Sequence, residues 1–193
     1  MVGFGRPVRH SFAEYLEVEE ATSGKHEYLD GQIFAMAGGS PEHSALIASV
    51  VAQLSAQVRG GPCRVHASEL RIRVASTGLA TYPDASVICG PWQRDPESER
   101  TVVNPSAVVE VLSPSTEAYD RGEKLVHYKQ IPALRAIALV AHERREIEVW
   151  TRTSASDAWA RELFGPGQHA RLMVEPGLIL DVSAVYDDAR EPD

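Results

Sequence analysis

The chain has 193 residues, of which 44% are hydrophobic and 24% are charged. This length and composition predict one globular domain with a sizeable buried core, and they exclude a largely disordered chain. Nineteen Lys and Arg side chains against 27 Asp and Glu give a net charge of -8, which argues against a surface that coats nucleic acid throughout. Residues 59–73 nevertheless hold four arginines and a single acidic residue, so a local basic surface remains open.

The two cysteines, Cys63 and Cys89, lack the CxxC spacing of a zinc site. One disulfide is conceivable, but unpaired thiols in a reducing compartment are the favoured interpretation. No run of about eighteen apolar residues occurs, so we expect no membrane span. The N-terminus lacks an apolar signal segment and carries Arg6, Arg9 and His10 where one would lie. These features predict a cytoplasmic protein.

The expected secondary structure combines short strands with a few helices. Ser11 can cap a first helix, Asp30-Gly31 is a strong hairpin signal, and Ser40-Pro41 starts a long helix. An apolar residue recurs every four positions along that helix, so one stripe faces the core. In chain order the expected elements are a helix over 12–21, hairpin strands over 25–29 and 32–37, a helix over 41–58, strands over 63–66, 70–75 and 85–89, a loop over 90–105, a strand over 107–112, a helix opened by Asp120 with Glu123 in a capping box and closed by Pro132, strands over 135–141 and 146–151, and short edge strands over 158–163, 171–174 and 178–181.

Strands outnumber helices in this order, and a helix crosses over between the strands at 107–112 and 135–141. Such a crossover joins parallel strands, whereas the hairpin is antiparallel, so we expect a mixed sheet. The predicted fold class is α/β (α+β), with a mixed β-sheet flanked by helices and an N-terminal helix and hairpin. One domain over residues 1–193 would have its core at about 11–152 and carry short strands and an acidic tail over 153–193.

Glu110 is the most informative residue, because it interrupts an otherwise apolar strand. On a strand it shares a face with Val108 and Leu112. An unpaired buried carboxylate costs several kcal/mol or loses its charge, so a carboxylate at this position needs a cation or a hydrogen-bond donor. The alternative is an edge strand on which Glu110 lies in water, or an arginine partner.

Asp84 starts the preceding strand, directly after Pro83, and therefore lies near a strand end. Alone it would be interpreted as a turn residue that caps its own backbone. Together with Glu110 on an adjoining strand, it would offer the paired carboxylate oxygens that Mg²⁺ prefers. Lys124, in the following helix, would stabilise developing charge beside a metal and phosphate, the alternative being an ordinary solvated lysine.

Several further residues are candidates for the same site. Glu27, before the hairpin turn, is a candidate for catalysis or for a second metal, or else a solvated hairpin carboxylate. His43, at the start of the long helix, would approach the site or the DNA unless it has a capping or core role. Arg64, Arg71 and Arg73 are the candidates for contact with a DNA backbone, the alternative being the polar face of an ordinary strand.

Three segments combine into a recognisable pattern. They are Tyr82-Pro83-Asp84-Ala85-Ser86-Val87, Val109-Glu110-Val111-Leu112-Ser113-Pro114-Ser115-Thr116, and Asp120-Arg121-Gly122-Glu123-Lys124-Leu125 with Tyr128. This combination resembles the bacterial family described as putative restriction endonucleases, in the PD-(D/E)XK nuclease superfamily. Tyr28-Leu29-Asp30-Gly31 and the helix start at Ser40–His43 also match, and the resemblance covers about residues 11–152.

The resemblance implies a restriction-endonuclease-like core that binds Mg²⁺, with Mn²⁺ as a substitute. Asp84 matches the Asp of the PD motif, Glu110 matches the acidic residue of (D/E)XK, and the carbonyl of Val111 would be a further ligand. Leu112 stands where the superfamily has its lysine, and Lys124 matches the lysine that this family supplies from the following helix. Gln32 is a second departure, since many members have Glu there.

These observations predict a Mg²⁺-dependent endonuclease that hydrolyses DNA with a metal-activated water. The catalytic residues would be Asp84, Glu110, Lys124 and Glu27, and a homodimer would match the symmetry of duplex DNA. One alternative is a non-catalytic DNA-binding or interaction module on the same fold. Another is a metal phosphatase that acts on small phosphoesters.

Overall fold

The computed structural model describes residues 9–153 and 158–189. Its helical segments are α1 (Phe12–Ala21), α2 (Pro41–Val58), α3 (Glu117–Tyr119), the π-helical turn η1 (Asp120–Lys124), α4 (Leu125–Tyr128) and α5 (Val182–Asp187). Its strands are β1 (His26–Leu29), β2 (Gln32–Ala35), β3 (Cys63–Ala67), β4 (Arg71–Arg73), β5 (Ala80–Thr81), β6 (Ala85–Cys89), β7 (Arg94–Asp95), β8 (Ser98–Val102), β9 (Ala107–Val111), β10 (Ala136–Val140), β11 (Ile147–Arg152), β12 (Trp159–Phe164), β13 (His169–Leu172) and β14 (Leu178–Asp181).

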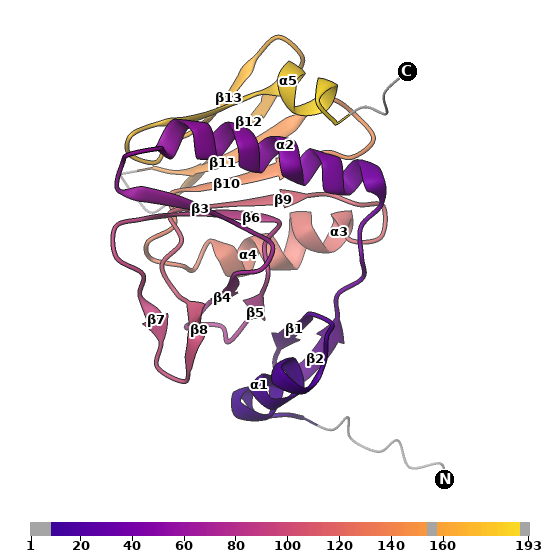
Figure 1. Cartoon of the computed structure of the whole chain (residues 1–193), viewed down its shortest axis with the longest axis vertical. Coiled ribbons are helices and arrows are strands. Elements are labelled where there is room, and N and C mark those ends of the chain that lie inside the picture. The colour runs from indigo at the N-terminus through magenta and orange to yellow at the C-terminus, as the bar shows by residue number, and fades with distance from the viewer. Residues whose placement is uncertain (1–8, 154–157, 190–193) are drawn as a thin grey trace.

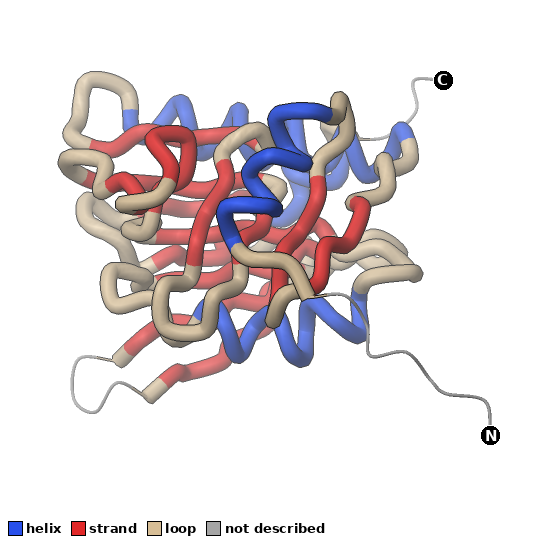
Figure 2. Tube along the Cα trace, turned by 90° about the horizontal axis from the view of Figure 1, so that it is seen from below, coloured by secondary structure: helices blue, strands red, loops and turns tan. Residues whose placement is uncertain are grey.

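The strands form a central mixed sheet in the order β12-β11-β10-β9-β6-β3. Strands β9 and β10 are parallel, whereas the other pairs of this sheet are antiparallel. A second sheet has the order β2-β1-β5-β4-β8-β7, and β13 pairs with β14. Helical segments lie on both sides of the stacked strands (Figures 1 and 2). This confirms the predicted class, a mixed sheet flanked by helices with an N-terminal helix and hairpin.

Alternation along β9 divides the core into two layers. Val109 and Val111 pack in the cluster that contains the apolar stripe of α2, while Val108 and Leu112 pack against the segment of α4. Because successive side chains of a strand point to opposite faces, Glu110 belongs to the second face. The central strand therefore directs its one carboxylate toward the α3–η1–α4 segment.

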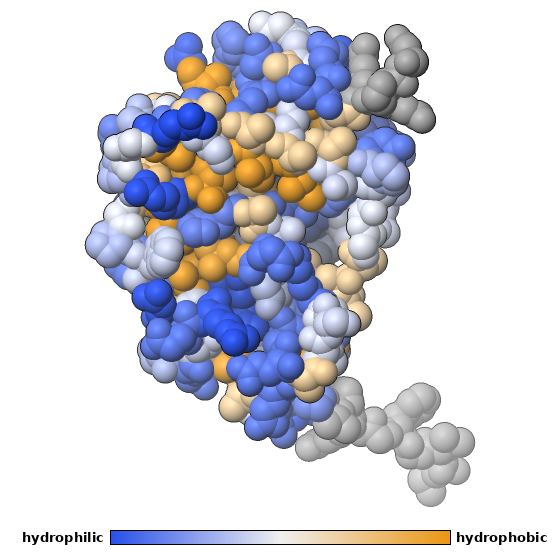
Figure 3. Space-filling model, viewed as in Figure 1, coloured by the Kyte–Doolittle hydropathy of each residue, from blue (hydrophilic) through white to orange (hydrophobic). Residues whose placement is uncertain are grey.

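The N-terminal elements follow local rules closely. Ser11 caps α1 in a reciprocal capping box with Glu14, as its position before the helix predicts. Asp30 and Gly31, with φ values of 49° and 81°, form the left-handed turn between β1 and β2. In Figure 1, α1, β1 and β2 lie at the end of the molecule opposite α5, and hydrophilic side chains predominate on this part of the face in Figure 3.

Several sequence predictions are wrong in detail. The loop expected over 90–105 contains β7 and β8. These strands could not be recognised in the sequence, because six of their seven residues are polar and they show no apolar alternation. Strand β12 lies at the sheet edge as predicted, but β13 and β14 form a separate pair, and α5 occupies part of the expected acidic tail. Asp120 does not cap its helix, because the helical segment already begins at Glu117.

The prediction of unpaired thiols is also wrong. Cys63 and Cys89 lie directly opposite each other across the β3–β6 pair and form a disulfide. Their separation of 26 residues in the sequence does not reveal the strand pairing that brings them together. None of the helices in the two described ranges is long and apolar enough to cross a membrane.

Candidate active site

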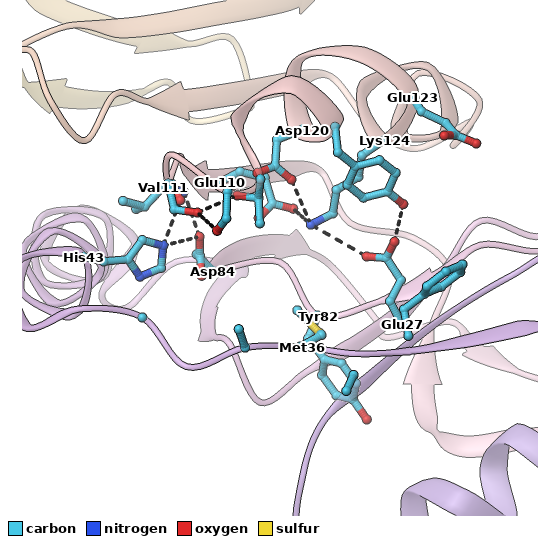
Figure 4. A pocket seen from close by; sticks show the side chains of 18 of the residues that line it. Glu27, Met36, His43, Tyr82, Asp84, Glu110, Val111, Asp120, Glu123 and Lys124 are labelled. Carbon is cyan, nitrogen blue, oxygen red and sulfur yellow. Dashed lines mark hydrogen bonds and ion pairs between the residues drawn. The ribbon is translucent and has the colours of Figure 1, made fainter.

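A cavity of about 1210 Å³ lies where the hairpin, the start of α2, the ends of β6 and β9 and the α3–η1–α4 segment meet. Asp84, Glu110, Lys124, Glu27 and His43 all line it. Figure 4 shows that their side chains come from different elements and point into the same space. The structure thus brings together residues that are far apart in the sequence.

Asp84 directly precedes β6, and the backbone at the end of the neighbouring strand β9 holds its side chain in place. The N–H of Val111 donates to Asp84 Oδ2 at 2.7 Å. His43 Nε2 lies 2.8 Å from the carbonyl oxygen of Val111 and 3.6 Å from Asp84 Oδ2 (Figure 4). The first turn of α2, begun by the cap at Ser40, therefore places an imidazole against both Asp84 and Val111.

Lys124 reaches the carboxylates from the helical segment. Its Nζ lies 2.9 Å from Glu110 Oε1, 3.4 Å from Asp120 Oδ1 and 3.9 Å from Glu27 Oε2. The side chains of Lys124 and Glu110 are only 6% and 5% exposed. Leu112, which stands at the usual lysine position of the (D/E)XK motif, is buried in the core instead. The structure therefore places the ammonium of Lys124 beside Glu110 despite its origin on another element.

Two tyrosines and a threonine complete the hydrogen bonding of the buried carboxylates. Tyr128 donates to Glu110 Oε1 at 2.5 Å. Glu27 accepts from Thr81 Oγ1 at 2.6 Å and from the hydroxyl of Tyr119. In the sequence, Tyr128 is part of the family motif but has no assigned role, so the bond from its hydroxyl to Glu110 was missed.

Asp120 is another site residue that sequence reasoning missed. It is 5% exposed and lies one helical turn before Lys124, with which it forms an ion pair. The i, i+4 spacing of an acidic and a basic residue was a usable signal. Asp120 was instead interpreted as a helix cap that pairs with Glu123, and this interpretation is wrong.

Burial governs the protonation of this cluster. Loss of hydration raises the pKa of Glu110 to about 8, although the Lys124 ammonium opposes the rise. Burial also raises the pKa of Asp84, while the N–H of Val111 acts to lower it. Burial alone would lower the pKa of Lys124, but the three surrounding carboxylates outweigh that effect and raise it. Lys124 therefore keeps its charge, and the carboxylates are crowded around a single cation.

The donor set suits a divalent cation. The carboxylates of Asp84 and Glu110 and the carbonyl of Val111 are hard oxygen donors, and Mg²⁺ is usually held by one or two carboxylates with waters completing its shell. Within residues 9–153 and 158–189, no three His, Cys, Asp or Glu side chains are grouped to enclose an ion by themselves. The carboxyl groups of Glu27, Asp84, Glu110 and Asp120 also outnumber the single ammonium of Lys124, and a nearby divalent cation would favour their ionised forms.

The three arginines expected to contact DNA do not line this cavity. Arg71 is 5% exposed, and its guanidinium contacts Glu19 and several hydroxyls. Arg73 pairs with Asp95. Arg64 is exposed on β3 and donates to two backbone carbonyls. Arg71 and Arg73 thus form contacts within the fold, outside the cavity that Asp84 and Glu110 line.

Comparison with known proteins gives the family. The model of the Uma2 family, described as "Putative restriction endonuclease", matches residues 12–183. The chain belongs to the Uma2 family. The "Uncharacterized protein slr1290" of Synechocystis sp. is 43% identical to this Uma2 chain over 144 residues, which are 75% of each chain. The "Uncharacterized protein sll1609" of the same organism is 29% identical over 153 residues, covering 79% of this chain and 86% of the relative.

A solved structure supports the Uma2 fold. The crystal structure of "a putative nuclease belonging to DUF820" from Anabaena variabilis matches with a TM-score of 0.71, over 88% of this chain and 93% of that chain. The two sequences are 19% identical, so this match supports the fold alone. The family match confirms the predicted relationship to restriction-endonuclease-like proteins of the PD-(D/E)XK type.

Proposed function

We propose that this Uma2 protein is a metal-dependent nuclease that hydrolyses phosphodiester bonds of DNA at the cavity around Glu110. The observation that carries the proposal is the buried contact of 2.9 Å between Lys124 Nζ and Glu110 Oε1, with Asp84 held at the end of the same strand. Membership of a family described as "Putative restriction endonuclease" supports the substrate class.

Asp84, Glu110 and the Val111 carbonyl are the groups that would hold Mg²⁺, or Mn²⁺ as a substitute. A divalent cation bound by them would supply Lewis acidity, the property that polarises a phosphate and acidifies a water molecule. The neighbouring residues keep this donor set in place. Val111 and His43 orient Asp84 through the contacts at 2.7 Å and 3.6 Å, and Tyr128 fixes Glu110 through its hydroxyl.

Lys124 has the role of electrostatic stabiliser. Its three carboxylate neighbours keep it protonated, so it presents a positive charge at the depth of the cavity where a phosphate would gain negative charge. Glu27 acts on Lys124 from the hairpin side, at 3.9 Å, and is itself fixed by Thr81. We therefore assign Glu27 a positioning role.

The test is cleavage of plasmid DNA and of a single-stranded oligonucleotide in Mg²⁺ or Mn²⁺. We expect the wild type to cut at least one substrate, EDTA to abolish cutting, and Glu110→Gln and Lys124→Ala to lose it. The matched control is Glu123→Gln, because Glu123 lines the same cavity but its side chain is 63% exposed. Cutting by Glu110→Gln at the wild-type rate would contradict the proposal. So would turnover of a small phosphoester without any cleavage of DNA.

A further inference from the structure

Strand β2 presents an aromatic ring to the cavity. Phe34 pairs with Glu27 across the β1–β2 hairpin, so the two side chains share a face. Phe34 lines the cavity with Leu29 and Met36, yet 47% of it is exposed. Figure 4 shows Glu27 beside Lys124, and Met36 farther along the cavity wall near Tyr82. The exposed ring of Phe34 therefore lies next to Glu27, and Glu27 contacts Lys124 in the charged cluster.

The charges of the cavity limit what can enter it. Its lining carries six carboxylates, those of Glu27, Asp30, Asp84, Glu110, Asp120 and Glu123. Lys124 is the one Lys or Arg among the described residues of this lining. A protein that tracks a double helix neutralises many phosphates with Lys and Arg. This cavity offers one such contact, so it is poorly suited to grip the backbone of a duplex.

The depth of the charged groups gives a second constraint. The side chains of Glu110 and Lys124 are only 5% and 6% exposed, so the reacting phosphodiester has to enter the cavity to reach them. In a duplex the bases on both sides of that phosphate are stacked and paired, so drawing the phosphate away from the helix into the cavity requires unstacking energy. An unpaired strand has no such requirement, and its bases bind to aromatic side chains irrespective of sequence.

We propose that the substrate of this site is an unpaired DNA strand, with one base stacked on Phe34 while the adjacent phosphodiester reaches Glu110 and Lys124. This inference rests on the proposed nuclease function and specifies its substrate. Leu29 and Met36 extend the apolar surface around the stacked base. The stacked base contributes more to binding than the phosphates do. This contribution offsets the repulsion between the phosphates and the acidic lining of the cavity. A two-fold dimer, expected for symmetrical cutting of a duplex, is not required.

The test is binding of a fluorescein-labelled single-stranded oligonucleotide and of the same sequence as a blunt duplex, measured by anisotropy with Ca²⁺ in place of Mg²⁺. We expect the single strand to bind at least about tenfold more tightly. Phe34→Ala should weaken its binding about tenfold, whereas Phe34→Trp keeps it. The matched control is Trp92→Ala, because Trp92 is 48% exposed but lies outside the cavity lining. Thermal unfolding checks that each variant is folded.

Salt dependence gives an independent measurement. With few phosphate contacts, the slope of log K against log salt concentration should be no steeper than about -1.5 for the single strand. Equal affinity for the duplex, or equal behaviour of Phe34→Ala and Trp92→Ala, would overturn the inference. If Phe34-dependent binding occurs but neither substrate is cut in Mg²⁺ or Mn²⁺, the nuclease proposal fails and the binding inference stands. If both substrates are cut equally and Phe34→Ala has no effect, the binding inference fails and the nuclease proposal stands.

Discussion

Replacing Lys124 with methionine removes the one cation at the centre of the buried cluster. The side chain of Lys124 is 6% exposed, and three carboxylates lie within 3.9 Å of its Nζ. Methionine keeps a similar shape but leaves these carboxylates without a countercharge. Glu110 is the most affected, since it has the shortest contact, at 2.9 Å.

The expected loss of stability is large. Removing one partner of a buried ion pair costs about 3–5 kcal/mol. For a chain of this size, each kcal/mol lowers Tm by about 2–4 °C, so Lys124→Met should lower Tm by about 6–20 °C in EDTA at pH 8. The control is Lys25→Met, because Lys25 pairs with Glu69, whose side chain is 82% exposed. Breaking that pair and the hydrogen bonds from Lys25 to Ser68 should cost about 1–2 kcal/mol.

The deficit of Lys124→Met should depend on pH. A carboxyl whose pKa is raised by folding contributes stability below its unfolded pKa and loses it as pH rises through the folded pKa. Burial raises the pKa of Glu110 and of Asp84, and loss of the ammonium raises both further. The difference in Tm from the wild type should therefore shrink from pH 8 to pH 5. Equal unfolding of Lys124→Met and Lys25→Met at pH 8 would refute this account.

Two further predictions separate roles at the site from roles in the fold. His43→Ala should weaken Mn²⁺ binding about 10–100-fold in a calorimetric titration, because His43 orients the Val111 carbonyl and Asp84; unchanged affinity would exclude this role. Arg71→Ala should lower the free energy of unfolding in urea by about 3 kcal/mol, because it removes the guanidinium that pairs with the buried Glu19 carboxylate and leaves that carboxylate with His26 and Tyr82. A loss of DNA affinity with unchanged stability would instead support Arg71 as a DNA contact.

The sequence predicts the elements whose signals are local. The cap at Ser11, the turn at Asp30-Gly31 and the apolar stripe of α2 depend on neighbouring residues alone, and the structure has each of them. The β7–β8 hairpin and the Cys63–Cys89 disulfide depend on pairing between strands and on exposure, which adjacent residues do not encode. Those features were therefore missed or misassigned.

The same distinction applies to the site residues: some are evident from their neighbours in the sequence, whereas others depend on tertiary packing. Glu110 could be singled out because a carboxylate in an apolar strand is energetically costly, whichever residues surround it. The contacts of Asp120 and Tyr128 with the cluster depend on how the helical segment packs over β9. Phe34 could not be connected with the site from sequence, since its position follows from the hairpin register with Glu27.

The central claim, that Asp84 and Glu110 together hold a divalent cation, is tested most directly by isothermal titration of the full chain with Mn²⁺. We expect binding by the wild type and by Glu123→Gln, which removes an exposed carboxylate from the same cavity. Asp84→Asn and Glu110→Gln should each lose detectable binding. Absence of binding by the wild type, or unchanged binding by Asp84→Asn, would contradict the account.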